Sequence, residues 1–212
     1  MTIQWLGQSC FKVQTKSGGE EITLITDPFD DATGIKMPRV QADIVTVSHE
    51  HHDHNNVEAI KGEPFLINSP GEYERQGTFV YGILGWHDDK QSERNIMYKI
   101  SSEDINLLHL GDMGKELTDD QLEKIGDVDV LLIPIGGNYT IDYKKALEVI
   151  AQIEPKIAIP MHYKTADNKA SKLAAIDDFL KHCGMRVEKT DKLKLTKKDL
   201  ANEDTRVVVL EI

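Results

Sequence analysis

The chain has 212 residues, of which 40% are hydrophobic, and its formal net charge is −11. This length and apolar content predict one domain with a single sizeable core, spanning residues 1–212. The acidic balance disfavours nonspecific binding to nucleic acid and to anionic membrane surfaces.

Strand-like runs dominate the first half of the chain. Short apolar or alternating runs predict strands at residues 2–6, 10–15, 21–27, 42–48, 64–68, 78–84, 94–100 and 104–110. A glycine-centred turn at 16–20 predicts that the second and third strands form a hairpin. Residues 55–62 predict a short helix that ends at Gly62, and residues 69–77 (SPGEYERQG) have the composition of a turn.

Helices and strands alternate in the second half. Apolar strands are predicted at 128–137, 156–162 and 206–212, and helices at 118–126, 141–153 and 170–184. Thr118 is the expected N-cap of the first helix, and Gly126 and Gly184 are expected stop signals. The last helix would place its apolar side chains on one face: Leu173, Ile176, Leu180 and Cys183. This order of elements predicts an α/β layered domain.

Cysteine usage and the opening residues indicate a compartment. Cys10 and Cys183 form no CxxC pair, which suits a reducing cytosol. The opening MTIQWLGQSCF predicts no signal peptide, and no apolar run approaches the ~18 residues of a membrane helix. We therefore expect a cytoplasmic globular protein without a membrane partner.

Four of the eight histidines are concentrated in SHEHHDHNN, residues 48–56, directly after an apolar strand. With its spacing, the motif is His49-x-His51-x-Asp53-His54. Residues two apart in an extended chain point the same way, so His49 and His51 can converge on one ion, while Asp53 and His54 can face a second. Imidazole with carboxylate suits zinc, manganese or iron. Because this loop alone cannot fill two sites, further ligands must come from elsewhere.

Several other metal and nucleotide motifs are absent. A metalloprotease HExxH helix would need histidine where Asp53 stands, and no cysteine pair supports a structural zinc finger. The sequence also contains neither GxxxxGK[ST] nor GxGxxG.

HxHxDH after an apolar strand resembles the metallo-β-lactamase superfamily. The resemblance extends, in chain order, to segments that match landmarks of its small single-domain members described as Zn-dependent hydrolases, near the ascorbate-6-phosphate lactonases: WLGQSCF, ITDPF, SPGEYERQG, HLGDM, LLIPIGGNYT and IPMHY. It covers nearly the whole chain. It implies a four-layer αββα sandwich with a dinuclear metal site at one rim.

The resemblance also implies a ligand set. The first ion would be bound by His49, His51 and a later histidine, for which His87 fits best by order. The second ion would be bound by Asp53, His54 and His162, and Asp112 would bridge both ions. His109 competes with His87, but it lies three residues before Asp112 and is expected to pack beneath the site.

The residues that would contact substrate are less sharply defined. Asn138, in the loop that also carries Tyr139 and Thr140, lies at a predicted strand end and could touch substrate. Tyr163 and Lys164 directly follow His162, and Lys164 could neutralise an anionic group. His52 is expected to be an exposed loop residue.

Hydrolysis by a water molecule shared between two metal ions is the activity that the resemblance implies. The expected cofactors are two divalent ions, zinc first and manganese or iron as alternatives, which lower the pKa of bound water from ~15.7 toward ~7. Asp53 would orient this nucleophile and take its proton, so Asp53 and Asp112 are the expected catalytic residues.

The expected substrate is a small metabolite that contains an ester, lactone or phosphoester bond. It could also carry anionic groups. A nucleic acid is disfavoured because the chain is acidic and lacks the extra domain that nucleases of this family usually carry. A thiolesterase of the glyoxalase II type would use the same ligands and stays open, as does a homo-oligomeric state.

Two other classes of function also stay open. Di-iron oxidoreductases of the family have glutamate at the position of His51 and add a flavodoxin domain, and this chain has neither. A non-catalytic binding or regulatory module should have lost ligands, whereas every expected position is filled here.

Overall fold

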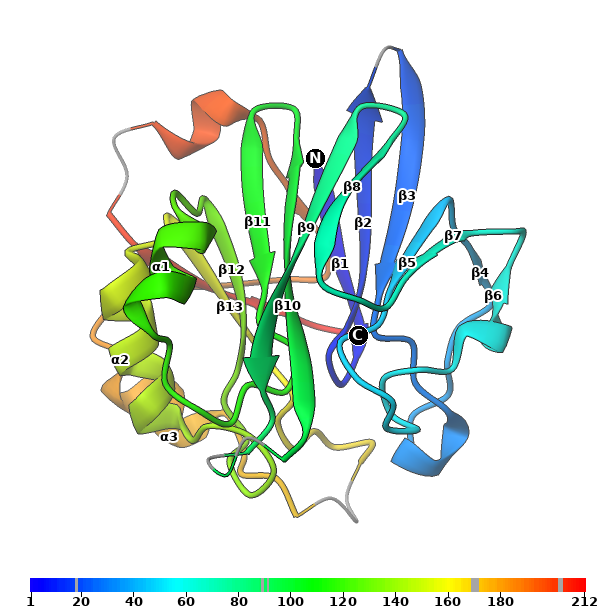
Figure 1. Cartoon of the computed structure of the whole chain (residues 1–212). Helices are drawn as coiled ribbons and strands as arrows, with labels where there is room; N and C mark the ends of the chain where they lie inside the picture. Colours follow the sequence, from blue (N-terminus) through cyan, green and yellow to red (C-terminus); the bar gives the residue numbers. More distant parts are fainter. Residues whose placement is uncertain (18, 89, 91, 169–171, 202–203) are drawn as a thin grey trace.

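Two β-sheets face each other in the computed structural model, which describes residues 1–17, 19–88, 90, 92–168, 172–201 and 204–212 (Figure 1). One sheet contains, in spatial order, β15 (Leu193–Lys194), β1 (Thr2–Gly7), β2 (Cys10–Ser17), β3 (Glu20–Thr26), β5 (Ile44–Thr46) and β7 (Phe65–Ile67). The other contains β14 (Val187–Thr190), β16 (Arg206–Leu210), β13 (Ile157–Met161), β12 (Val130–Pro134), β11 (Ile105–His109), β10 (Arg94–Ser102), β9 (Thr78–Trp86) and β8 (Gly71–Arg75). A short ribbon pairs β4 (Val40–Gln41) with β6 (Ile60–Lys61).

Helices cover the outer face of the second sheet, on the left in Figure 1. They are α1 (Asp119–Ile125), α2 (Tyr143–Ile153) and α3 (Asp177–His182). The side chain of Thr118 caps α1 by accepting from the N–H of Gln121, and Gly126 ends the helix, as the sequence predicts. Asp142 caps α2 in the same way through the N–H of Lys145.

Two apolar clusters hold the layers together. The larger fills the space between the sheets, and all five residues of each of β12, β13 and β16 are buried. The smaller packs against the opposite face of the first sheet, where Ile25 and Val45 meet Phe29 and Ile60 from residues 28–62. Because β3 and β5 are buried on both faces, this segment supplies the outer layer there. The α/β class is confirmed, with helices over the second sheet and residues 28–62 over the first.

Three predicted elements differ from the structure. Residues 69–77 contain strand β8, which pairs with β9, rather than only a turn. Residues 55–62 form a 3₁₀ turn at Val57–Ala59 and then β6. The last helix begins at Asp177 rather than near 170, because the backbone of Ala174 and Ala175 pairs with Gly136 and Lys164; residues 169–171 lie outside the described part of the chain.

No helix among the described residues is long and apolar enough to cross a membrane.

Tyr98 links the two sheets through its buried hydroxyl. The hydroxyl donates to the carbonyl oxygens of Val47 at 2.8 Å and Ile67 at 3.0 Å, both at the end of strands in the opposite sheet. Tyr98→Phe should therefore lower the free energy of unfolding by about 1–2 kcal/mol, because the shared hydroxyl proton is lost while the Ile67 carbonyl keeps the N–H of Val47. Urea denaturation of both proteins measures this loss, and an unchanged midpoint would contradict it.

Candidate metal centre

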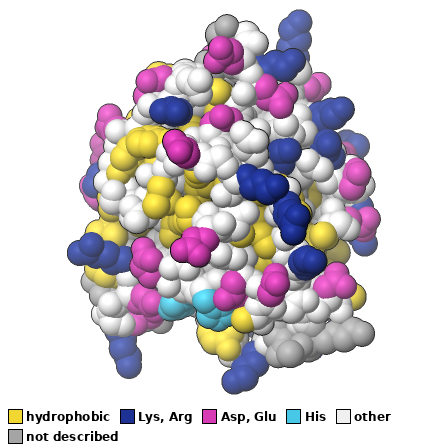
Figure 2. Space-filling model, turned by 90° about the vertical axis from the view of Figure 1, so that its right-hand side faces the viewer, with side chains coloured by type: hydrophobic (Ala, Val, Ile, Leu, Met, Phe, Trp, Pro, Cys, Tyr) yellow, Lys and Arg dark blue, Asp and Glu magenta, His cyan; other side chains and the backbone are white. Residues whose placement is uncertain are grey.

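Four loops at one rim of the sandwich carry the residues that the sequence singles out. The loop 48–54 follows β5, His87 follows β9, Asp112 follows β11, and His162 follows β13. Figure 2 shows histidine side chains at the lower rim of the molecule, beside acidic side chains. The rule that sites form at the ends of strands in layered α/β folds therefore holds for this chain.

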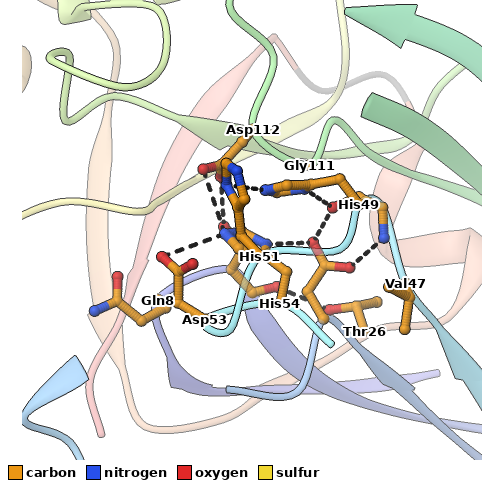
Figure 3. Close-up of polar contacts among 12 residues, drawn as sticks. Gln8, Thr26, Val47, His49, His51, Asp53, His54, Gly111 and Asp112 are labelled. Carbon is orange, nitrogen blue, oxygen red and sulfur yellow. Dashed lines mark hydrogen bonds and ion pairs between the residues drawn. The ribbon is translucent and has the colours of Figure 1, made fainter. Parts of the chain in front are cut away.

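The structure brings all seven expected ligands together. Their donor atoms form three groups, each lying within 4.8 Å: His49, His51 and His87; His49, His54 and Asp112; and Asp53, His54 and His162. Figure 3 shows Asp112, Asp53 and the imidazoles of the loop turned toward one another. The groups share members, so the set is one continuous cluster.

Asp112 stands at the centre of this cluster. Its Oδ2 atom lies 3.3 Å from His54 Nε2, 3.6 Å from His87 Nε2 and 3.4 Å from His162 Nε2. Asp53 adds a second carboxylate, whose Oδ2 lies 3.6 Å from His54 Nε2 and 3.7 Å from His162 Nε2. The Asp112 carboxylate therefore faces imidazoles from three different loops.

These spacings fit metal ligands better than hydrogen-bonding partners. Tetrahedral ligands about 2.0–2.1 Å from zinc lie about 3.3 Å from one another. The nitrogen atoms His49 Nε2 and His51 Nδ1 are 3.0 Å apart, close to that separation. His54 Nε2 and His87 Nε2 are buried and have no hydrogen-bond partner among the described residues. Buried polar atoms without partners are costly, and a cation between them would satisfy them.

Burial and neighbouring charges shift the titration of the cluster. Burial, followed by the charge of His54, lowers the pKa of His49 to about 3, so its imidazole is neutral and can offer a lone pair. Burial alone would raise the pKa of Asp112, but the nearby His162 and His54 outweigh it and hold that pKa well below its usual value. Asp112 is therefore ionised, which metal binding requires.

His109 takes no direct part in the cluster. Its Nε2 atom lies 2.8 Å from the carbonyl oxygen of Ser9, and its Nδ1 accepts from the N–H of Gly111 at 3.1 Å. Both ring nitrogens are thus engaged beneath the site. Between the two candidates for the remaining position of the first group, the geometry favours His87.

A buried aspartate that sequence reasoning left without a role supports the loop. Asp27 accepts from the N–H and hydroxyl of Ser48 at 2.8 and 2.6 Å, and its Oδ2 lies 2.9 Å from His54 Nδ1. This arrangement orients the His54 ring so that Nε2 faces the cluster. Its signal in the sequence is the ITD at the end of a strand that runs beside β5.

Asn95 similarly fixes the loop of Asp112. Its Oδ1 accepts from the N–H of Asp112 at 2.9 Å, and its Nδ2 donates to the carbonyl of Leu110 at 2.8 Å. Glycine is required at position 111, where φ is +56° and an added Cβ would lie 2.2 Å from Asn95 Oδ1.

The residues predicted to contact substrate do not line the cavity beside the cluster. A cavity of about 390 Å³ is lined by His51, His52, Asp53, His87, Asp112, Tyr139 and His162. Tyr163 is buried and stacks on Trp5 with ring centroids 5.1 Å apart, so it packs beneath the site. Asn138 and Lys164 are exposed and are not among the residues that line the cavity. Tyr139, next to Asn138, lines it instead.

Glu93 lies against the imidazole of His51. Its Oε1 is 2.6 Å from His51 Nε2, on the side of the ring away from His49, and its carbonyl accepts from the N–H of His87 at 3.0 Å. One residue thus contacts two members of the first group. Partners of this kind orient a metal-binding imidazole and raise its basicity.

Glu93→Ala is expected to weaken zinc binding at the first site by about 10–100-fold, because His51 loses its orienting carboxylate. Glu93→Gln should lose less, since its amide oxygen can still accept from the ring. Competition with a chromophoric chelator measures both. Glu50→Ala is the matched control. Glu50 lies next to His51 in the chain, but its carboxylate contacts Asn55 instead. Equal affinities for Glu93→Ala and the wild type would contradict the role.

Two facing sheets with a histidine and aspartate cluster at one rim define a metal-binding α/β sandwich. The sequence model of the beta-lactamase superfamily domain matches residues 2–162. The chain therefore belongs to the β-lactamase superfamily, as the resemblance in its motifs implies.

Relatives and solved structures agree with this assignment. A UPF0173 metal-dependent hydrolase of Carboxydothermus hydrogenoformans is 28% identical, with 89% of this chain and 96% of the relative covered. Another from Thermoplasma volcanium is 31% identical over 78% of this chain and 84% of the relative. A Thermotoga maritima structure, described as a Zn-dependent hydrolase of the metallo-β-lactamase superfamily, is 38% identical, covers 99% of both chains and has a TM-score of 0.79.

Proposed function

We propose that residues 1–212 form one hydrolase domain with a two-metal centre, which cleaves an ester, lactone or phosphoester bond in a small molecule. At the coarser level, the chain is a metal-dependent hydrolase of the metallo-β-lactamase fold, in keeping with the names of its relatives. The number of ions, their identity and the bond cleaved are the proposed part. Zinc is the first expectation, because imidazole and carboxylate ligands suit it.

One observation carries the proposal. Asp112 Oδ2 lies within 3.6 Å of imidazole nitrogens from three separate loops, at spacings typical of ligands on a shared ion. The groups on its two sides would divide the ligands between two ions. His49, His51 and His87 would hold the first; Asp53, His54 and His162 the second; and Asp112 would contact both.

The chain's own residues supply positioning and proton transfer. Bound divalent ions would lower the pKa of a coordinated water and polarise the oxygen of the scissile bond. Asp53 lines the cavity and is partly exposed, so its carboxylate can orient the attacking water and accept its proton. Asp112 is almost fully buried and takes the holding role instead.

Metal loading followed by a substrate panel tests the proposal. Metal-free protein should be inactive, and zinc or manganese should restore hydrolysis of at least one member of a panel of carboxylic esters, lactones, thioesters and phosphoesters. A protein that binds two ions but leaves every class intact would favour a binding or regulatory module. Hydrolysis that chelators do not abolish would contradict the metal-dependent mechanism.

A further inference from the structure

Tyr139 presents a large ring at the mouth of the cavity. It is 51% exposed, and it lines the cavity together with the candidate ligands. Of the other large apolar side chains in the described part of the chain, only Ile212, the last residue, is more exposed than Tyr139. Pockets that bind small molecules are lined mainly by apolar and aromatic side chains, so a ring on this cavity wall is available to a ligand.

The loop that carries Tyr139 is fixed to both neighbouring parts of the site. The N–H of Ile141 donates to the carbonyl of Met113, the residue after Asp112, at 2.9 Å. On the other side, a Cβ at Gly136 would lie 2.2 Å from the carbonyl oxygen of His162. The loop therefore packs between the segments that carry Asp112 and His162.

The turn within this loop places the Tyr139 backbone at its tip. The N–H of Tyr139 donates to the carbonyl of Gly137 at 2.6 Å, and the N–H of Gly137 donates to the carbonyl of Ile141 at 3.1 Å. Gly137 and Asn138 have φ near +60°, which closes the turn tightly. A backbone held in this way loses little conformational freedom when the side chain that it carries binds a ligand.

Flat rings also make up much of the remaining cavity wall. His51, His52 and His87 contribute imidazoles, and His52 is held by Asp30, whose Oδ1 lies 3.1 Å from its Nδ1. None of the described lining residues is lysine or arginine. The side chains at the mouth thus offer π-surfaces for a flat group, and positive charge would come from the bound ions instead.

We propose that Tyr139 determines specificity by stacking on an aryl group beside the scissile bond, so that aryl-bearing esters are preferred over saturated ones of equal size. This inference rests on the proposed hydrolase function and narrows its substrate class. The ring, rather than the hydroxyl, makes the contact. Tyr139→Phe should therefore keep the preference and Tyr139→Ala should lose it.

A matched substrate pair isolates the ring contact. Methyl phenylacetate and methyl cyclohexylacetate have the same size and leaving group, so the ratio of their kcat/KM values reports on aryl recognition. The zinc-loaded wild type should prefer the aryl ester, and Tyr139→Ala should reduce that preference by roughly tenfold. Phe79→Ala is the control, because Phe79 is an exposed aromatic residue outside the cavity.

Calorimetry with phenylacetate and cyclohexylacetate separates this proposal from the proposed function. If neither ester is hydrolysed, tighter phenylacetate binding that Tyr139→Ala abolishes would support the stacking role, while the choice of bond would fail. The stacking role is overturned if Tyr139→Ala keeps the wild-type preference, if Tyr139→Phe loses as much as Tyr139→Ala, or if the wild type binds both acids equally or not at all.

Discussion

Replacing Asp112 with alanine is expected to remove at least one metal ion and to lower kcat/KM by at least about 10³-fold. The reason is that one oxygen of Asp112 faces three imidazoles, so its loss opens both halves of the site at once. Metal ions supply several kcal/mol of transition-state stabilisation, which corresponds to an effect of this size. Metal analysis and steady-state kinetics on the same preparation measure both losses.

Asp112→Asn provides the control for folding. It keeps the shape of the side chain and removes the charge, so it should also lose metal while its circular dichroism stays that of the wild type. If either variant kept full metal content and full turnover, Asp112 would not be the shared ligand.

His87→Ala is expected to empty the first site selectively. Bound metal should fall from about two ions per chain to about one, because the first group loses one of its three imidazoles. His87 Nε2 is buried and has no hydrogen-bond partner in the described part of the chain, so its removal leaves no described acceptor unsatisfied. The fold should therefore survive, and inductively coupled plasma analysis of the dialysed protein measures the occupancy.

His109→Gln separates His87 from its competitor. Both nitrogens of His109 are engaged with backbone groups, so its replacement should lower the free energy of unfolding by about 1–3 kcal/mol without changing the metal content. Unchanged occupancy in His87→Ala together with metal loss in His109→Gln would reverse the two roles.

The sequence predicted which side chains converge because their positions are marked locally, while their role as metal ligands stays a prediction. His49, His51, Asp53 and His54 follow one strand, and strand ends carry the other three candidates, so a layered fold brings them to one rim. The choice between His87 and His109 needed three dimensions, since it depends on which ring nitrogens are already engaged. The role of Asp27 was missed because its partners lie twenty or more residues away.

The elements that sequence patterns missed depend on long-range pairing. Pro70 and Gly71 mark a turn by local chemistry, yet Gly71 and the four residues that follow it pair with β9. Residues 170–176 have a helical pattern, but pairing with Gly136 and Lys164 holds the backbone of Ala174 and Ala175 outside a helix. The sequence did not predict strands β14 and β15. No residue of β14 is fully buried, so it lacks an apolar face, and β15 has only two residues.

Asn138 and Tyr139 illustrate the same limit at the substrate side of the site. Both stand on one turn, and the sequence could not tell which would face the cavity. The tight turn and its attachment to Met113 bring Tyr139 to the wall. Neighbouring loop residues are separated only by backbone geometry of this kind.

Elemental analysis of untagged protein after exhaustive dialysis and reloading tests the two-metal centre most directly. The geometry of the cluster predicts about two zinc, manganese or iron ions per chain. A content near zero that added metal does not raise would contradict the central claim, and would leave the seven converging side chains without the role proposed for them.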